Sequence, residues 1–437
     1  MSARQLSRNE SKKKECEFWI FVRATLRNMD SLFCTTMTNL SAAACRHAAA
    51  VICWCLLWNN LEVRVSKKIA GKTAAAEIVV RPYRTPICIC VLVSLLCAFP
   101  SAHGQLLFSA RVAGPVANLY SIDAAGELHK ITDNIRWRDM DADISPDGRI
   151  VFSSNREPNP KIDLERRAEH FHVYLTDSDG GIVPLTSGDG DERTPRFAPD
   201  GETIAFVRRV GGSQQLVLVG PDSDGRIIFS GEEILDFSWA PGGKRLCLAV
   251  RSGGEPALWL VNTDGGDGVA VPMRGNDWIA AARWSPNGGH IALVRHPQQS
   301  GDRRLTLLEL ESGRERQLSP AGAQVQGTPE WSRDGGRLLY AALLDYEFSY
   351  DETAHKKVYK GAMHIFESDL DGGTRQLTRG DGLHRAPVYS PDGKAIAYLY
   401  AGRLDARRLA LRVADRNGGE AREVYTAVAR LSGLRWF

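Results

Sequence analysis

Four histidines lie in two stretches that interrupt an otherwise regular sequence pattern. His170 and His172 end a polar stretch at 155–172, and His355 and His364 lie in a second one at 344–364. Neutral imidazoles bind divalent metals and transfer protons near pH 7, so these side chains could hold a metal ion with an acid/base role. Solvent-exposed loop histidines are the simpler interpretation, because the set follows no strict ligand spacing.

Arginine and aromatic side chains accompany these histidines. Both stretches are predicted to connect the second and third strands of a repeated unit, and such connections share one face with the connections between units. Arginines on that face could grip carboxylates with two hydrogen bonds, although pairing with a neighbouring Asp or Glu is the simpler role. The predicted binding-face residues are Arg138, Arg166, His170, His172, Arg193, Trp278, Tyr346, Tyr350, His355, His364, His384 and Arg385.

The sequence lacks the common catalytic motifs. It has no G-x-S-x-G nucleophile elbow after a strand, no phosphate-binding glycine loop and no H-E-x-x-H helix. We therefore assign no catalytic residue, no metal ligand and no cofactor from the sequence, and we expect a protein that is not an enzyme.

A phrase that recurs six times identifies the elements that must position these residues. It consists of an apolar residue, a turn resembling Ser-Pro-Asp-Gly and an apolar strand. The turns start at Ser145, Ala198, Ala240, Ser285, Ser332 and Ser390. The intervals between these starts are 53, 42, 45, 47 and 58 residues. Strand-rich repeats of this length are typical of β-propellers, in which each repeat forms one four-stranded antiparallel blade.

Two positions of the phrase have predictable structural roles. In the turn, Pro sets φ, Asp accepts hydrogen bonds from its own backbone, and Gly adopts a positive φ. The predicted turn aspartates are Asp147, Asp200, Asp334 and Asp392. A large residue directly before each turn should pack between neighbouring blades. These residues are Ile144, Phe197, Trp239, Trp284, Trp331 and Tyr389.

The two ends of the repeat region complement each other. Residues 105–132 match the second to fourth strands of a unit but have no first strand, whereas LSGLRWF at 431–437 matches a first strand. We infer that the C-terminal segment completes the N-terminal blade, because this closure pairs otherwise open strand edges. The sequence therefore predicts an all-β propeller over 105–437, with seven blades, or six as the alternative.

An apolar segment precedes the repeats. PICICVLVSLLCA at 86–98 has a basic flank and is followed by small residues before Gln105, which is typical of a secretory signal. We assign 81–104 to a signal peptide, with a signal anchor as the alternative, and interpret 1–80 as unstructured or as an over-extended start. Eight of the nine cysteines precede Gln105, so Cys247 has no disulfide partner in the predicted propeller.

Charge divides at the same place. Residues 1–104 contain 14 Lys and Arg against 6 Asp and Glu, and residues 105–437 contain 41 against 46. A mildly acidic propeller gives no electrostatic reason to expect a nucleic-acid partner.

The repeat resembles a known family. The segments TPRFAPDGETIAF, TPEWSRDGGRLLY and APVYSPDGKAIAY resemble the WD-like propeller repeat of the TolB family. The resemblance covers about residues 105–437 and implies a non-catalytic periplasmic propeller that mediates protein–protein interaction in the cell envelope, within a Tol-type system. A peptidoglycan-associated lipoprotein is the partner that it implies. The TolB family also has six blades and an α/β domain before the propeller, and this sequence has no room for such a domain after its signal.

The remaining expectations concern assembly and the alternative function. We expect a monomer that does not span the membrane once the signal is removed. The alternative is a propeller enzyme, such as a metal-assisted polysaccharide lyase resembling oligogalacturonate lyase. That activity requires at least three of five histidines around one ion. The five are His170, His172, His355, His364 and His384.

Overall fold

All elements in the described part of the computed structural model are β-strands. The structure describes residues 104–437 apart from 112–115, 157–169, 177–179, 221–224, 267, 299–300, 354 and 427–430. The stretch at 1–80, the predicted signal peptide up to residue 103 and Arg166 lie outside the described residues. Within the described residues, no helix is long and apolar enough to span a membrane.

Five of the sheets contain four strands each, and their strands are consecutive in the chain with one exception. The exception is the first sheet, in the order β28 (Leu431–Trp436), β1 (Leu106–Ala110), β2 (Asn118–Ile122) and β3 (Leu128–Lys130). The second contains β4 (Asp139–Ile144), β5 (Ile150–Ser154), β6 (His172–Thr176) and β7 (Ile182–Pro184). The third contains β8 (Asp191–Phe197), β9 (Ile204–Val210), β10 (Ser213–Val219) and β11 (Arg226–Gly231). The fourth contains β12 (Glu233–Trp239), β13 (Arg245–Ser252), β14 (Glu255–Asn262) and β15 (Val269–Val271). The fifth contains β16 (Trp278–Trp284), β17 (His290–His296), β18 (Arg304–Glu309) and β19 (Glu315–Gln317).

The sixth sheet contains eight strands in two runs of four. The first run is β20 (Gln324–Trp331), β21 (Arg337–Asp351), β22 (Lys356–Asp369) and β23 (Thr374–Gln376). The second run is β24 (Leu383–Tyr389), β25 (Ala395–Ala401), β26 (Ala410–Asp415) and β27 (Arg422–Thr426). A single parallel pair, Met363 with Leu383, joins the two runs. The described strands thus form seven antiparallel runs of four, a grouping that favours the predicted seven blades.

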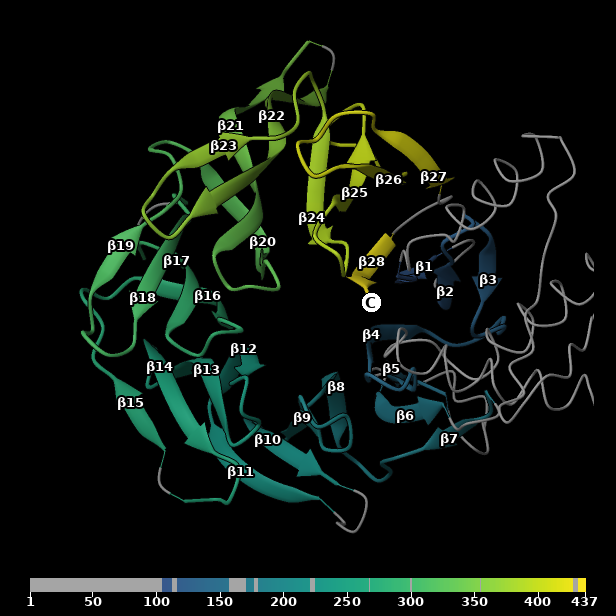
Figure 1. Ribbon diagram of the computed structural model, residues 1–437, viewed down its shortest axis with the longest axis vertical. Coiled ribbons are helices and arrows are strands. Elements are labelled where there is room, and N and C mark those ends of the chain that lie inside the picture. The colour runs from purple at the N-terminus through teal and green to yellow at the C-terminus, as the bar shows by residue number, and fades with distance from the viewer. Residues whose placement is uncertain are drawn as a thin grey trace, which may run out of the picture. The chain divides into compact units, whose positions relative to one another are not determined.

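The runs are arranged as the blades of a β-propeller around a common centre, with the first strand of each run innermost (Figure 1). Neighbouring first strands contact one another from β12 through β16, β20, β24, β28 and β4 to β8. The circle is completed between β8 and β12, where the Trp239 indole donates a hydrogen bond to the Arg196 carbonyl. The C-terminal strand β28 pairs antiparallel with β1, as the complementary ends of the sequence predict.

The hydrophobic core lies between neighbouring blades. Val151 and Val173 of the second sheet, for example, pack with Phe197 and Phe206 of the third. The large residue before each turn contributes to these interfaces, since Phe197, Trp284, Trp331 and Tyr389 are all less than 10% exposed. The Trp331 indole also donates a hydrogen bond to the Arg283 carbonyl of the preceding blade, at 3.0 Å. These side chains therefore join blades, as predicted.

The repeated turns have the expected local chemistry. The Asp200 carboxylate accepts hydrogen bonds from the amides of Glu202 and Thr203, and Asp334 accepts one from the amide of Gly336. The fourth turn residue adopts a positive φ, a conformation that is strained for residues with a Cβ. Four examples are Gly148, Gly201, Gly335 and Gly393, with φ of 91, 75, 69 and 68°. In the described part of the chain, each first strand also carries a register shift against its second strand.

Closure by β28 makes a testable contribution to stability. Leu434 is 4% exposed and belongs to the cluster that contains Leu106 and Phe108 of β1. We expect Leu434→Ala to lower the free energy of unfolding by about 3 kcal/mol, because it leaves a cavity in this cluster. Val269→Ala is the matched control, since Val269 is 63% exposed, and should change stability by less than about 0.5 kcal/mol. Equal urea midpoints for the two variants would contradict closure by β28.

Candidate functional site

The second predicted loop, 344–364, is an extension of a blade. β21 continues to Asp351 and β22 begins at Lys356, and the two strands remain paired up to these residues. The insertion therefore lies in the predicted connection between the second and third strands of the run, and it consists of paired strands. The physical reason is the alternation of Tyr346, Phe348 and Tyr350 with polar residues, a period of two that favours paired strands.

The extended hairpin has one aromatic face. Tyr346, Phe348 and Tyr350 are 38%, 52% and 46% exposed, and alternate positions place them on the same side of β21. Phe348 lies opposite Tyr359 of β22, with ring centroids 5.4 Å apart. The other side is polar, where Lys360 Nζ lies 3.1 Å from Glu347 Oε2. The hairpin thus exposes contiguous aromatic area beyond the core of the ring.

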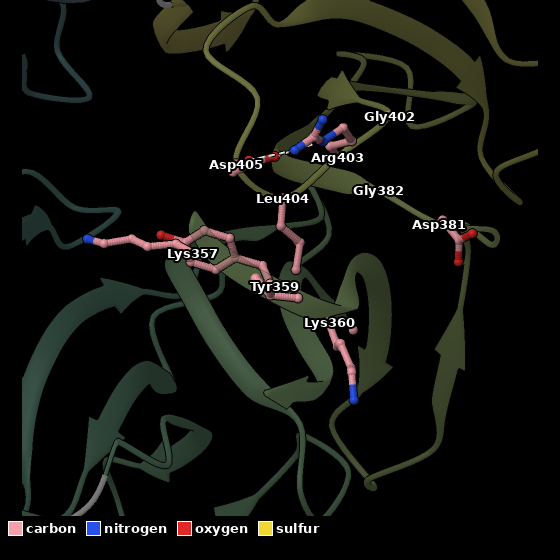
Figure 2. A pocket seen from close by; sticks show the side chains of 11 residues that line it. Lys357, Tyr359, Lys360, Asp381, Gly382, Gly402, Arg403, Leu404 and Asp405 are labelled. Carbon is pink, nitrogen blue, oxygen red and sulfur yellow. Dashed lines mark hydrogen bonds and ion pairs between the residues drawn. The ribbon is translucent and has the colours of Figure 1, made fainter. Parts of the chain in front are cut away.

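A cavity lies between this hairpin and the next blade (Figure 2). Its volume is about 550 Å³, and its lining residues come from three segments of the chain. They are Lys357, Val358, Tyr359, Lys360 and Gly361 of β22, Asp381 and Gly382 before β24, and Gly402, Arg403, Leu404 and Asp405 after β25. Gly382 has φ +120°, and a Cβ there would lie 2.4 Å from the Ala401 carbonyl oxygen. This wall of the cavity therefore requires glycine.

Most charges in the cavity are paired locally. Both Arg403 Nε and Nη2 donate hydrogen bonds to the Asp405 carboxylate, at 3.0 and 2.8 Å. Lys360 pairs with Glu347 on the hairpin. Within the described residues, Lys357 and Asp381 have no such ion pair, and they lie on opposite sides of the cavity in Figure 2. The cavity therefore offers one cation and one carboxylate to a ligand.

Two predicted binding-face histidines are buried in strands. His364 of β22 is 7% exposed and His384 of β24 is 4% exposed, and their rings lie 5.6 Å apart. His384 Nδ1 lies 2.9 Å from the Met363 carbonyl oxygen. Because a carbonyl oxygen can only accept, Nδ1 carries the proton of this hydrogen bond. Burial lowers the pKa of both imidazoles below the usual value. The two predicted binding-face residues therefore lie buried in the junction between β22 and β24 and do not reach the surface of the face.

The other predicted histidines lie elsewhere. His172 Nδ1 lies 3.3 Å from the buried Glu192 carboxylate, which also accepts a hydrogen bond from Arg208 at 2.8 Å. His170 is half-buried just before β6, and His355 is exposed in the turn of the extended hairpin. A metal-assisted lyase would need at least three of the five histidines around one ion. Within the described residues, the structure brings only two of them together, His364 and His384.

Arg138 and Arg193 meet at one side chain. Both guanidinium groups lie over the Phe171 ring, at 5.8 and 3.5 Å from its centroid. Arg193 Nε also donates a hydrogen bond to Asp191, at 3.0 Å. Burial lowers the pKa of Arg138, and the neighbouring Arg111 and Arg193 charges add to this effect. This pair therefore has structural partners in the protein.

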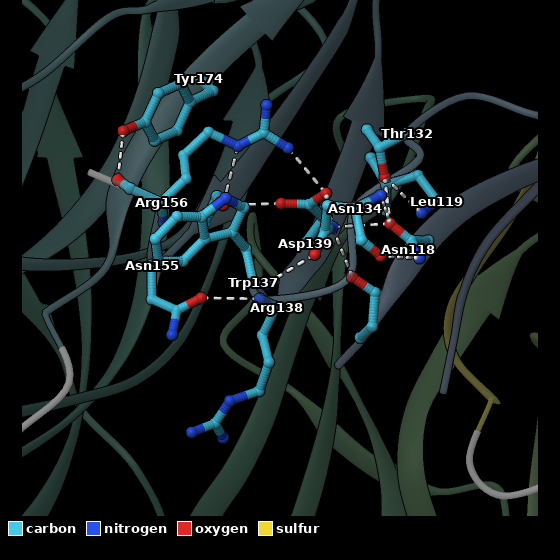
Figure 3. Close-up of polar contacts among 12 residues, drawn as sticks. Asn118, Leu119, Thr132, Asn134, Trp137, Arg138, Asp139, Asn155, Arg156 and Tyr174 are labelled. Atoms are coloured by element: carbon cyan, nitrogen blue, oxygen red, sulfur yellow. Dashed lines mark hydrogen bonds and ion pairs between the residues drawn. The ribbon is translucent and has the colours of Figure 1, made fainter. Parts of the chain in front are cut away.

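The strand that follows Arg138 begins in a polar network (Figure 3). Asp139 is fully buried, and its carboxylate accepts hydrogen bonds from Ser154, Arg156 and Asn134 at 2.6, 2.7 and 2.9 Å. The Arg138 amide donates to Asn155. Because the Asp139 carboxylate is satisfied by these donors, we interpret the network as a structural link between the first two blades.

The remaining predicted residues are more scattered. Trp278 begins β16 and lies under the Arg251 guanidinium, which is 5.8 Å from its ring. Arg385 is exposed on β24. Of the predicted residues, Tyr346, Tyr350 and His355 lie in the extended hairpin that borders the cavity.

A set of charges near the centre of the ring was not predicted from the sequence. Arg435 of β28 lies 3.4 Å from Asp143 of β4. Arg196 of β8 lies 3.6 Å from Asp236 of β12, which also forms an ion pair with Arg283 of β16. Each pair joins two first strands that belong to different sheets, where no hydrogen-bond ladder exists.

Two further carboxylates that interact with these arginines have raised pKa values. Burial raises the pKa of Glu330 on β20, although the Arg435, Arg283 and Arg196 charges oppose the shift. Burial also raises the pKa of Asp141. Conversely, burial lowers the pKa of Arg196 to about 10. A signal for these residues does exist in the sequence, since Asp143, Arg196, Arg283, Glu330 and Arg435 each directly precede the large residue of a first strand.

Comparisons with known proteins show what this propeller resembles. Residues 165–350 match the family model of the TolB β-propeller domain. A TolB homologue from Chlorobaculum tepidum is 28% identical over 119 residues, which make up 27% of this chain and 25% of the homologue. The chain therefore carries a TolB-like β-propeller, as the repeat predicts.

Other similar proteins have enzyme names. The uncharacterized peptidase YuxL of Bacillus subtilis is 25% identical over 213 residues, which make up 47% of this chain and 29% of YuxL. The chain thus spans less than a third of the length of these two relatives. The match with a solved prolyl endopeptidase structure covers 85% of this chain and 59% of the endopeptidase chain, with a TM-score of 0.53 and 12% identity. That likeness concerns the propeller fold alone.

The central ion pairs can be tested through Asp236. Its side chain is 9% exposed and contacts Arg196, Arg283 and the Ala282 amide. We expect Asp236→Asn to lower the free energy of unfolding by about 3 kcal/mol, because two poorly solvated arginines lose their counter-charge. Glu347→Gln, which breaks an exposed ion pair, should cost less than about 1 kcal/mol in the same urea titration. A loss no larger than in this control would exclude a stabilising role for the central set.

The buried histidine pair predicts a pH dependence of stability. Both His364 and His384 have lowered pKa values in the folded protein. As the pH falls below the unfolded value of about 6.5, the unfolded chain therefore takes up protons first and stability decreases. The decrease ends below the folded pKa values. Urea midpoints between pH 8 and pH 5 should fall more steeply for the native protein than for His364→Gln, and identical slopes would contradict this assignment.

Proposed function

We propose that this protein is a non-catalytic, periplasmic, TolB-like propeller that binds a protein partner in the cell envelope through the extended β21–β22 hairpin. The observation that carries the proposal is the aromatic face of Tyr346, Phe348 and Tyr350, each between 38% and 52% exposed. Aromatic side chains are enriched in protein interfaces, where they supply large contact areas at a low entropic cost.

The position of this face supports a binding role. The extension lies beyond the residues that pair with β20, because that pairing ends at Gln324 with Leu343. Exposed contiguous aromatic area is unfavourable in water unless a partner covers it. The aromatic face therefore has no evident role in closing the ring and is available to another molecule.

The sequence and the relatives support the proposed compartment and partner. A basic flank and a short apolar segment before residue 105 are typical of a secretory signal, and a relative of the propeller is a TolB homologue. We propose a peptidoglycan-associated lipoprotein of the same envelope as the first partner to examine, within a Tol-type system.

Substitution of two aromatic residues tests the proposal. Phe348→Ser with Tyr350→Ser should weaken binding of the full chain to the purified lipoprotein by at least about tenfold, because truncated aromatic anchors cost 1–2 kcal/mol or more. The matched control is Val210→Ser with Ile227→Ser, which removes two apolar side chains that are 51% and 47% exposed on another blade. Binding can be measured by surface plasmon resonance.

Two outcomes would count against the proposed function. Equal affinity of the native protein and the Phe348/Tyr350 variant would exclude the hairpin as the binding surface. Equal losses in both double variants would show that the effect does not belong to the hairpin.

A further inference from the structure

One edge of β22 is open along the extended hairpin. On one side, β22 pairs with β21 from Lys356 to Asp369. On the other side, it pairs with Leu383 at Met363 and with β23 from Phe366 to Ser368. Between Lys357 and Ala362, no strand in the described part of the chain pairs with that second edge. Alternate residues of an unpaired edge present backbone N–H and C=O groups outward.

The cavity lies along this open edge. Five consecutive residues, from Lys357 to Gly361, line it. Neighbouring side chains on a strand point to opposite faces, so a cavity on one face would be lined by every second residue. A consecutive lining indicates that the cavity faces the edge of β22. At its end, the Met363 amide donates a hydrogen bond to the Gly382 carbonyl, at 2.9 Å, so the edge already accepts a parallel neighbour there.

We propose that the cavity binds an extended peptide segment of the protein partner, which pairs with β22 as an added strand. Main-chain hydrogen bonds supply affinity in this mode of recognition, and side-chain pockets supply specificity. The volume of about 550 Å³ falls within the range of about 300–1,000 Å³ that ligand pockets occupy. This inference rests on the proposed function in that the occupant belongs to the partner of the aromatic face.

The chemistry of the cavity specifies the segment. Lys357 and Asp381 lie on opposite sides, and Tyr359 and Leu404 lie between them (Figure 2). The occupant therefore carries an acidic side chain at one end, a basic side chain at the other and apolar residues between. Lysines along an open edge discourage indiscriminate strand pairing, so a segment that neutralises Lys357 is favoured over a neutral one.

A blocked synthetic peptide tests the mode of binding. The probe is acetyl-Glu-Val-Thr-Val-Lys-amide. Two further versions are N-methylated on alternate amides, so that one version blocks the N–H groups of one strand edge and the other version blocks those of the opposite edge. One methylated version should bind the full chain at least about tenfold more weakly than the parent, because it loses two backbone hydrogen bonds. The other should bind within about twofold of the parent. Equal binding of all three peptides, or no binding of the parent at about 1 mM, would overturn the proposal.

A charge reversal tests the specificity. Lys357→Glu should reduce affinity for the parent peptide by about tenfold and restore it for a peptide whose Glu is replaced by Lys, because the ion pair is re-formed with opposite signs. Lys394→Glu is the control, since Lys394 is another exposed lysine and does not line the cavity. Amide shifts of residues 357–361 and 381–382 in NMR spectra should accompany binding. Shifts confined to other residues would place the peptide elsewhere.

The two proposals can fail separately. If the partner binds through Phe348 and Tyr350 but Lys357→Glu and the methylated peptides have no effect, strand addition is wrong and the proposed function stands. If Lys357→Glu weakens binding of the peptide while the Phe348/Tyr350 variant binds the partner with native affinity, the peptide site stands and the aromatic interface is wrong.

Discussion

The antiparallel pairing of β28 with β1 is the contact on which the ring depends. Each blade buries its faces against two neighbours, so an incomplete first blade would leave two interfaces open. β28 contacts β4 on one side and β24 on the other. It also brings Leu431 and Leu434 into the cluster that contains Phe108 and Tyr389. One strand of six residues thus connects the two ends of the described chain through a shared core.

Closure places first strands of different sheets next to one another without a hydrogen-bond ladder between them. Polar side chains replace that ladder. The Phe197 amide of β8 donates to Asp143 of β4, and the Trp284 amide of β16 donates to the Ser238 hydroxyl of β12. The ion pairs of Asp236 with Arg196 and Arg283 act in the same region. The central charges are therefore a consequence of ring architecture, and they are more costly to disrupt than exposed ion pairs because they are poorly solvated.

The sequence was most informative where each repeat carries the same physical constraint. The turns and the large residues before them follow from local chemistry that recurs along the repeats, and the pairing of β28 with β1 follows from the incomplete unit at each end. The site was less predictable. His364 and His384 come together only because β22 and β24 are joined at Met363 and Leu383, and a contact between two repeats leaves no local pattern. The central charges have a repeated position, but their pairing depends on which strand lies next to which.

The hairpin extension illustrates a different limit. Alternation of Tyr346, Phe348 and Tyr350 with polar residues indicates a strand, but the longer spacing of this repeat equally allows a loop. Pairing over 15 residues of β21 and 14 of β22 decides between them. A two-stranded ribbon that leaves the core gains little from burial, because a ribbon has no second layer on either face. The aromatic side chains lie on β21 and the open edge belongs to β22, so an extended segment along β22 would pair the edge while another part of the same partner would cover the aromatic face. A single partner would thereby cover the apolar area and pair the backbone groups, and for that reason we assign both features to one site.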